Sequence, residues 1–107
     1  GEPERTVTMY SIDNLNKLAH VGELVPETMQ AFTKWDQLAL ADGSIPKKYK
    51  ELMAIAVALT TQCPYCIELH RQRAADAGAT EKELAETVHV AAALRAGGAI
   101  THGSHLF

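Results

Sequence analysis

The sequence predicts an all-α protein, a compact bundle of about five to six short helices forming a single domain over residues 1–107. The chain is 47% hydrophobic, which is enough for one core. Alanine and leucine supply much of that fraction while aromatic residues make up only 6%, a composition that favours close-packed helices over a sheet sandwich. Apolar residues recur at helical spacing between capping and breaking signals, which sets the helix boundaries.

Residues 1–24 are predicted to form an N-terminal helical extension. Ser11 can cap a first short helix, which we expect to end near Gly22. Pro26 suits the first turn of a second helix, and the break at residues 42–44 ends it. The apolar residues of this second helix, which we expect to face the core or an interface, are Phe32, Trp35, Leu38 and Ala39.

Two helices at the centre of the chain are joined by a short break at Thr61-Gln62. Pro46 favours the start of the third helix, which runs from 47 to 61 and is apolar nearly all round, as in a buried central helix. Cys63-Pro64 opens the fourth helix, which should end near Ala77, with Gly78 as a C-terminal capping residue.

The last predicted helix begins at Thr80 and Glu83, which have the spacing of a capping box. We expect it to end at Gly97-Gly98, leaving residues 99–107 as a tail. His89 lies between valines, as a core or interface histidine would. His102 and His105 of the tail fit a weak metal-binding tract, a flexible end or a segment lining a neighbouring subunit's site.

Charge and cysteine usage limit the classes of partner. The net charge is −3 with no basic run, so we expect no nucleic-acid or membrane-surface partner. No segment reaches the roughly 18 apolar residues of a membrane span, and no signal peptide is visible. Two cysteines three residues apart, without a secretory signal, favour a reducing compartment. We therefore expect a cytoplasmic protein.

The motif Cys63-Pro64-Tyr65-Cys66, followed by His70, contains both cysteines of the chain. Positions 63, 66 and 70 share one face of a helix. A cysteine at the helix N-terminus has its thiol pKa lowered by the helix dipole. His70, one turn beyond Cys66, could accept the thiol proton, which makes Cys66 the predicted nucleophile and Cys63 the cysteine that resolves it to a disulfide.

Two other interpretations of the cysteines stay open at this point. A zinc site would need Glu51 or another histidine as a fourth ligand besides Cys63, Cys66 and His70. A structural disulfide between residues three apart would close too small a loop to stabilise much. We expect a redox-active dithiol and no metal.

The stretch from Glu51 to His70 resembles the alkyl hydroperoxidase D-like branch of the carboxymuconolactone decarboxylase family. In that branch a glutamate precedes the first cysteine by twelve residues, the cysteines are three apart, and a histidine follows four residues later. All three intervals match here, and the resemblance extends over about residues 45–98. One position departs from the pattern, because Tyr65 replaces the histidine found before the second cysteine in the best-known members.

The resemblance implies a thiol peroxidase or disulfide reductase that needs no metal or organic prosthetic group and assembles as a trimer or hexamer. By position, Cys66 attacks the peroxide, Cys63 resolves it, His70 relays the proton and Glu51 orients the relay. An external dithiol, a small thiol or a lipoyl-type protein would supply electrons. Tyr65, which removes a second relay imidazole, is expected to pack at the mouth of the site, with a substrate contact as its alternative role.

Spacing alone does not join Glu51 to the motif. Glu51 lies about 18 Å along its helix from the turn and His70 about 10 Å along the next helix. The two helices must therefore cross, or the glutamate must reach.

Three functions follow from these features. The first is an antioxidant hydroperoxide reductase or disulfide oxidoreductase that uses the dithiol with a His70–Glu51 relay. The second is a carboxymuconolactone decarboxylase-like enzyme, against which the dithiol argues. The third is a non-enzymatic redox-sensing module. Independently of the resemblance, two helices apolar on many faces predict a homo-oligomer.

Overall fold

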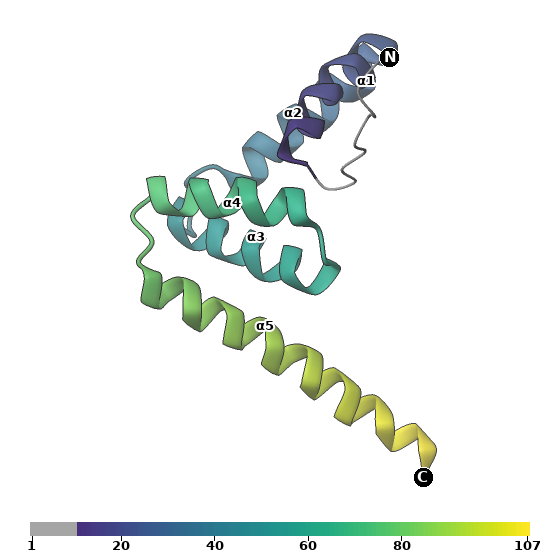
Figure 1. The fold of residues 1–107 in the computed structure, drawn as a ribbon, viewed down its shortest axis with the longest axis vertical. Helices are drawn as coiled ribbons and strands as arrows, with labels where there is room; N and C mark the ends of the chain where they lie inside the picture. The colour runs from purple at the N-terminus through teal and green to yellow at the C-terminus, as the bar shows by residue number, and fades with distance from the viewer. Residues whose placement is uncertain (1–10) are drawn as a thin grey trace, which may run out of the picture.

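The computed structural model describes residues 11–107, and residues 1–10 of the predicted N-terminal extension lie outside the described residues. The described part is helical with no strand, which confirms the all-α class. Helices α1 and α2 form an N-terminal pair, α3 and α4 form a central hairpin, and α5 projects beyond them (Figure 1). The elements are η1 (Ile12–Lys17), α1 (Leu18–Leu24), α2 (Pro26–Leu40), α3 (Lys47–Thr61), α4 (Pro64–Asp76), α5 (Glu81–His102) and η2 (Gly103–Leu106).

The N-terminal pair has the capping expected from the sequence. The Ser11 hydroxyl accepts a hydrogen bond from the Asp13 backbone N–H at 3.3 Å, although the first turns are a 3₁₀-helix. Helices α1 and α2 pack closely at Gly22, where an added Cβ would lie 3.2 Å from Met29 Cγ. Only a residue without a side chain fits there unless Met29 moves.

The turn between α3 and α4 places the cysteines. Gln62 ends α3 in the left-handed conformation at φ 58°, and Cys63 is the N-cap of α4. The Cys63 sulfur accepts a hydrogen bond from the Cys66 backbone N–H at 3.3 Å, and Pro64 occupies the first turn, where its missing N–H costs nothing. The predicted start of α4 at Cys63-Pro64 is confirmed.

Helix α5 packs against α3 and runs in the same direction. The Lys48 ammonium lies 3.0 Å from Glu83 Oε2 near the start of both helices, and Arg95 Nη1 donates to the Thr60 carbonyl at 3.0 Å near the end of α3. Because α3 ends at Thr61, α5 beyond Arg95 extends past it. The capping box of Thr80 and Glu83 is present as predicted.

The predicted end of the fifth helix at Gly97-Gly98 is wrong. Helix α5 continues to His102 and η2 follows, so the expected tail at 99–107 is largely helical. Glycine costs a helix about 1 kcal/mol but keeps its backbone N–H, so two glycines weaken the helix without breaking it. The His102 and His105 rings lie 5.7 Å apart, and His89 is exposed rather than in the core.

The buried apolar residues come from α3, α4 and α5 and are small or medium in size. Among the described residues they are Ile55 and Ala58 of α3, Ala74 of α4 and Ala91 of α5. The prediction that α3 is buried all round is wrong within one chain, since its outer face is open. Large hydrophobic side chains that are more than half exposed on α2 and α3 are Phe32, Trp35, Leu38, Met53 and Val57. Within residues 11–107, no helix is long and apolar enough to cross a membrane.

Candidate redox site

The two cysteines form a close pair at the N-terminus of α4. Their sulfurs lie 2.6 Å apart and share a hydrogen bond. Both residues are half-buried and neither is in a disulfide. The N-terminal end of a helix carries unpaired N–H groups and a positive dipole end, which favour a thiolate. The arrangement therefore provides a dithiol that can be oxidised within one turn of helix.

The surroundings push the pKa values of the two thiols in opposite directions. The hydrogen bond shared with Cys66, and then the Cys66 backbone N–H, lower the pKa of the Cys63 thiol. Burial, and then the hydrogen bond with Cys63, raise the pKa of the Cys66 thiol to about 11. The negative charge of Asp36 on α2 adds a smaller rise. Of the two thiols, Cys63 is therefore the more easily deprotonated.

This difference predicts selective alkylation of the reduced protein. With a limiting amount of iodoacetamide near neutral pH, Cys63 should be modified about tenfold faster than Cys66, because its thiolate fraction is higher although its intrinsic nucleophilicity is lower. Tandem mass spectrometry of the peptide that contains both cysteines measures the ratio of alkylated Cys63 to alkylated Cys66. Modification of Cys66 should rise only as the pH approaches about 11.

A matched variant checks the cause of that selectivity. In Cys66→Ala, Cys63 loses its shared hydrogen bond, so its alkylation should require a higher pH than in the wild type. Equal modification of both cysteines in the wild type, or an unchanged pH dependence for Cys63 in the variant, would contradict the assigned cause.

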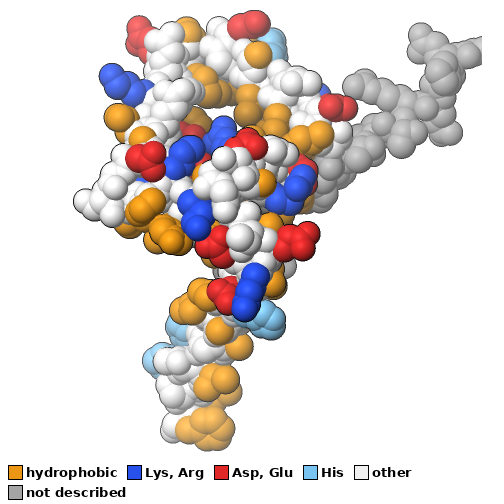
Figure 2. Space-filling view, turned by 90° about the vertical axis from the view of Figure 1, so that its left-hand side faces the viewer, with side chains coloured by type: hydrophobic (Ala, Val, Ile, Leu, Met, Phe, Trp, Pro, Cys, Tyr) orange, Lys and Arg blue, Asp and Glu red, His pale blue; other side chains and the backbone are white. Residues whose placement is uncertain are grey.

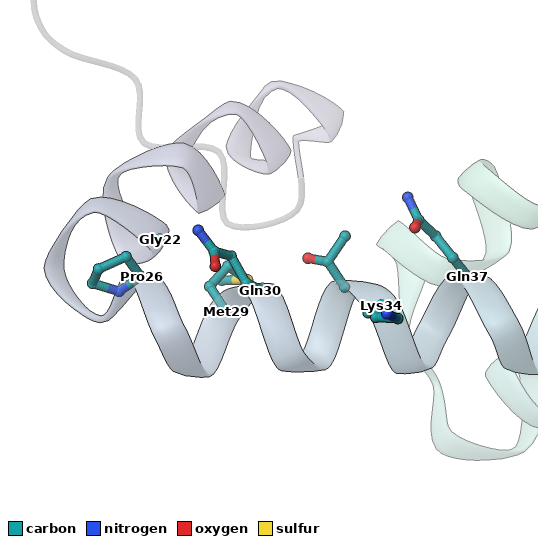
Figure 3. A pocket seen from close by; sticks show the side chains of 7 residues that line it. Gly22, Pro26, Met29, Gln30, Lys34 and Gln37 are labelled. Carbon is teal, nitrogen blue, oxygen red and sulfur yellow. The ribbon is translucent and has the colours of Figure 1, made fainter.

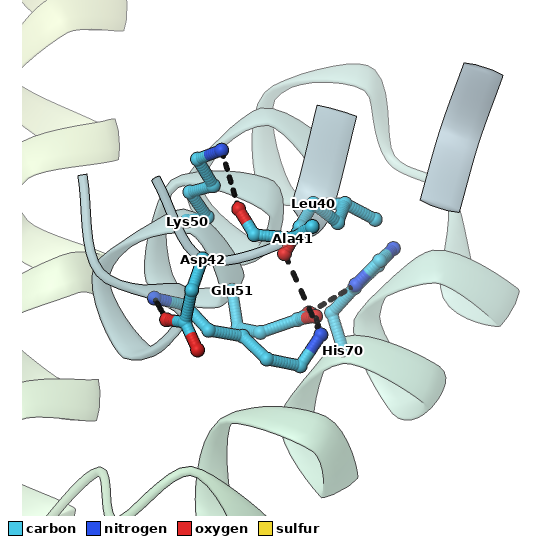
Figure 4. A network of polar contacts seen from close by, with 7 residues as sticks. Leu40, Ala41, Asp42, Lys50, Glu51 and His70 are labelled. Carbon is cyan, nitrogen blue, oxygen red and sulfur yellow. Dashed lines mark hydrogen bonds and ion pairs between the residues drawn. The ribbon is translucent and has the colours of Figure 1, made fainter. Parts of the chain in front are cut away.

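The structure brings Glu51 and His70 together across α3 and α4. Glu51 Oε2 lies 2.6 Å from His70 Nδ1; the carboxylate is fully buried and the His70 side chain is 13% exposed (Figure 4). A neutral imidazole bonded in this way carries its proton on Nδ1, which leaves the Nε2 lone pair to accept another. Among residues 11–107, His70 has no hydrogen bond to either sulfur, so the two pairs are separate contacts on one helix.

Lys47 was not among the predicted site residues, yet it contacts the Glu51–His70 pair. Its ammonium lies 3.3 Å from Glu51 Oε1, the carboxylate oxygen that does not face His70. The sequence signal was the four-residue interval between Lys47 and Glu51, which is common on exposed helix surfaces and does not by itself indicate a site.

Tyr65, between the cysteines, is half-buried and contacts the N-terminal segment. Its hydroxyl accepts a hydrogen bond from Asn14 Nδ2 of η1 at 2.9 Å. Nothing in the sequence around Asn14 indicated this contact, which joins residues 51 positions apart. Within the described part of the chain, no three His, Cys, Asp or Glu side chains converge as metal ligands would.

A hollow of about 440 Å³ lies beside α1 and α2, away from these groups (Figure 3). Met29, Gln30, Lys34 and Gln37 are among the residues that line it. It holds neither a thiol nor an acid–base pair. A second hollow, of about 430 Å³, includes Lys47 and therefore adjoins the Glu51–His70 pair.

These features define an all-helical protein with a dithiol at a helix N-terminus and a buried glutamate–histidine pair. A sequence profile of the carboxymuconolactone decarboxylase family matches residues 26–107. The chain belongs to the carboxymuconolactone decarboxylase family, which confirms the predicted resemblance, and the alkyl hydroperoxidase D-like branch is consistent with this result.

Similar proteins agree with this assignment. An uncharacterized protein of the cox locus of Paracoccus denitrificans is 45% identical over 90 residues, which cover 84% of this chain and 78% of that protein. The crystal structure of an apo carboxymuconolactone decarboxylase family protein from Legionella pneumophila has a TM-score of 0.74 at 37% identity, covering 86% of this chain and 82% of the other. A Methanobacterium thermoautotrophicum structure has a TM-score of 0.75 at 34% identity, covering 79% and 96%.

Proposed function

We propose that this protein is a thiol-dependent oxidoreductase that reduces hydroperoxides, or disulfides, with Cys63 and Cys66. The observation that carries the proposal is the close sulfur pair at the start of α4, with His70 of the Glu51–His70 pair one helical turn beyond Cys66. In the proposed mechanism the nucleophile, the resolving thiol and the proton acceptor would all belong to α4 and its N-cap, which supports the proposal.

With a hydroperoxide, the Cys66 thiol gives its proton to His70 Nε2 and the thiolate attacks the terminal peroxide oxygen. The O–O bond breaks, Cys66 becomes a sulfenic acid, and the alkoxide takes the proton from His70 and leaves as an alcohol. The Cys63 thiolate then attacks the Cys66 sulfur and forms the disulfide, and the hydroxide released leaves as water after gaining a proton.

An external dithiol completes the cycle by thiol–disulfide exchange. One of its thiolates attacks the Cys63 sulfur, and its second thiol resolves the mixed disulfide, so the donor becomes a disulfide and both protein thiols return. Cys66 leaves in the first exchange and takes up a proton. Cys63 leaves in the second exchange, when the mixed disulfide is resolved, and its lowered pKa suits it to that role. The same exchange run in reverse reduces a disulfide substrate, which is the other direction of the proposed activity.

The proposal is tested by adding hydrogen peroxide or an organic hydroperoxide to the reduced protein. We expect one equivalent to be consumed and the intact mass to fall by two hydrogens, as an intramolecular disulfide forms. With dithiothreitol present the protein should turn over many times. Oxidation that occurs once without turnover would instead indicate a redox sensor, and thiols that survive excess peroxide would contradict the proposal.

A carboxymuconolactone decarboxylase-like activity is the second candidate, because the family profile bears that name. In this case the Glu51–His70 pair would supply acid–base chemistry and the cysteines would have no role. The variant with both cysteines replaced by serine separates the two candidates, since a decarboxylase would keep its activity on a carboxylated lactone.

We also propose that the chain assembles with copies of itself. Its Cα radius of gyration is 17.7 Å, whereas a compact domain of this length has about 13 Å. Hydrophobic side chains cover much of the projecting part of α5 (Figure 2). Leu94, next to Arg95, and Ile100 in the projecting part are 67% and 78% exposed, and apolar helix surface of this extent is usually covered.

A further inference from the structure

Lys47 connects the buried Glu51–His70 pair with the molecular surface. Its side chain is 44% exposed, whereas that of Glu51 is fully buried. The Lys47 ammonium lies 3.3 Å from Glu51 Oε1 and 3.5 Å from the Leu40 carbonyl, at the end of α2 (Figure 4). The opposite carboxylate oxygen faces His70, so Glu51 is held between Lys47 and the histidine.

A buried carboxylate is unfavourable unless its charge is compensated. When His70 is neutral it donates a hydrogen bond to Glu51 but brings no charge. Among residues 11–107, Lys47 is the only lysine or arginine within ion-pair distance of Glu51. The lysine therefore supplies the compensating charge in the state in which His70 is free to accept a proton.

We propose that Lys47 is a positioning residue that keeps Glu51 ionised and directed at His70, so that His70 stays neutral until it takes the thiol proton. Lys47 acts through Glu51 and touches neither sulfur. The inference rests on the proposed function, in which His70 is the proton acceptor. Without Lys47, the Glu51–His70 pair would lose this compensating charge and retain its proton to a higher pH than in the wild type.

The other charged groups around the 430 Å³ hollow that adjoins Lys47 do not replace the lysine. Asp36 of α2 and Asp42 of the α2–α3 connection line it with Arg73 of α4. Asp42 Oδ1 accepts a hydrogen bond from the Lys47 backbone N–H at 2.6 Å and so caps the start of α3. Removing the Lys47 ammonium leaves two carboxylates and one guanidinium there, a balance that also favours retention of the proton.

Lys50 offers a matched control on the same helix. Its ammonium donates to the Ala41 carbonyl at 2.6 Å, much as Lys47 donates to the neighbouring Leu40 carbonyl. Within residues 11–107, however, the Glu51 carboxylate pairs with Lys47 and His70 and not with the Lys50 ammonium. Both lysines thus hydrogen-bond a backbone carbonyl where α2 ends. Only Lys47 also forms an ion pair with Glu51.

The test is an NMR titration of the His70 ring in reduced, ¹⁵N-histidine-labelled protein, with His70→Gln identifying its signals. Because this measurement needs no substrate, it can fail or succeed independently of peroxide turnover. We expect Lys47→Met to raise the titration midpoint of His70 by about one pH unit, a value reduced by the partial exposure of Lys47. Lys50→Met should leave the His70 midpoint unchanged. Lys47→Arg, which keeps the positive charge, should have a midpoint close to that of the wild type.

Lys47→Gln is a second variant, whose amide can still donate to the Leu40 carbonyl if Lys47→Met does not fold. It should show the same upward shift, since it also lacks the charge. A wild-type midpoint in both neutral variants would overturn the inference. An equal shift in Lys50→Met would also overturn it, because the cause would then be loosening of the connection between the helices.

Discussion

Cys66→Ser is expected to lower hydroperoxide turnover by at least about a thousandfold, because the variant lacks the sulfur that attacks the peroxide. Cys63→Ser should fail differently. Its Cys66 still attacks, but no protein thiol resolves the product, so without added thiol the protein should consume a single equivalent and stop, and with a dithiol it should turn over slowly. Coupled consumption of hydroperoxide and dithiol, measured by steady-state absorbance, distinguishes a slow variant from one that reacts once.

Mass spectrometry of the two variants provides the control for this prediction. Cys63→Ser should gain one oxygen as a sulfenic acid, or form a mixed disulfide with the added thiol, while Cys66→Ser should stay reduced. The circular dichroism spectra of both should match the wild type, because serine is nearly isosteric with cysteine. If Cys66→Ser turned over at the wild-type rate and Cys63→Ser did not, the nucleophile would be Cys63, the sulfur with the lower pKa.

The opposite pKa shifts fit a division of labour between the two sulfurs. A low-pKa thiol is a good leaving group and a ready partner in exchange with external thiols. A high-pKa thiol is a stronger nucleophile once deprotonated, but at neutral pH it needs a base to remove its proton. In the proposed mechanism Cys66, with its pKa raised to about 11, therefore depends on His70 in a way that Cys63 does not.

Local signals in the sequence predicted most of the fold. The capping box at Thr80 and the Cys63-Pro64 helix start depend on neighbouring residues only, and both are present. The end of α5 was predicted wrongly because the cost of Gly97 and Gly98 is small compared with a continuous run of helical hydrogen bonds.

The candidate site could be predicted only in part, because local spacing predicts contacts within one helix but not contacts between two helices. The Cys63–Cys66 pair follows from spacing within one helix, whereas the Glu51–His70 contact joins two helices. The positions along α3 and α4 leave an offset of about 8 Å between the two residues, and yet Glu51 Oε2 and His70 Nδ1 lie 2.6 Å apart. Only the family pattern pointed to Glu51, and no pattern pointed to Lys47.

Exposed hydrophobic side chains are a feature that the sequence could predict only in part. Periodicity shows that a helix has an apolar face but not which molecule covers it. Trp35, whose spacing predicts a core or interface residue, is 71% exposed in the single chain. A second copy of the chain would reconcile the two, because an interface between subunits has the same apolar pattern as a core.

Introducing charge on the exposed apolar surface of α5 is therefore expected to dissociate the assembly. The double variant Leu94→Asp, Ile100→Asp should elute as a monomer, while the wild type should have a mass several times that of the 11.6 kDa chain. A carboxylate buried between subunits without a partner costs several kcal/mol, which exceeds what most interfaces can lose. Size-exclusion chromatography with light scattering measures both masses.

Lys82→Asp is the matched control, since it adds the same charge to α5 at its polar first turn, where the helix dipole favours an acid. It should keep the wild-type mass. A monomeric wild type would contradict the proposed assembly. A double variant that keeps the wild-type mass would place the contact elsewhere, and the exposed face of α2 with Phe32 and Trp35 would then be the surface to change. Because the Glu51–His70 pair lies within one chain, the dissociated variant should retain the His70 titration of the wild type.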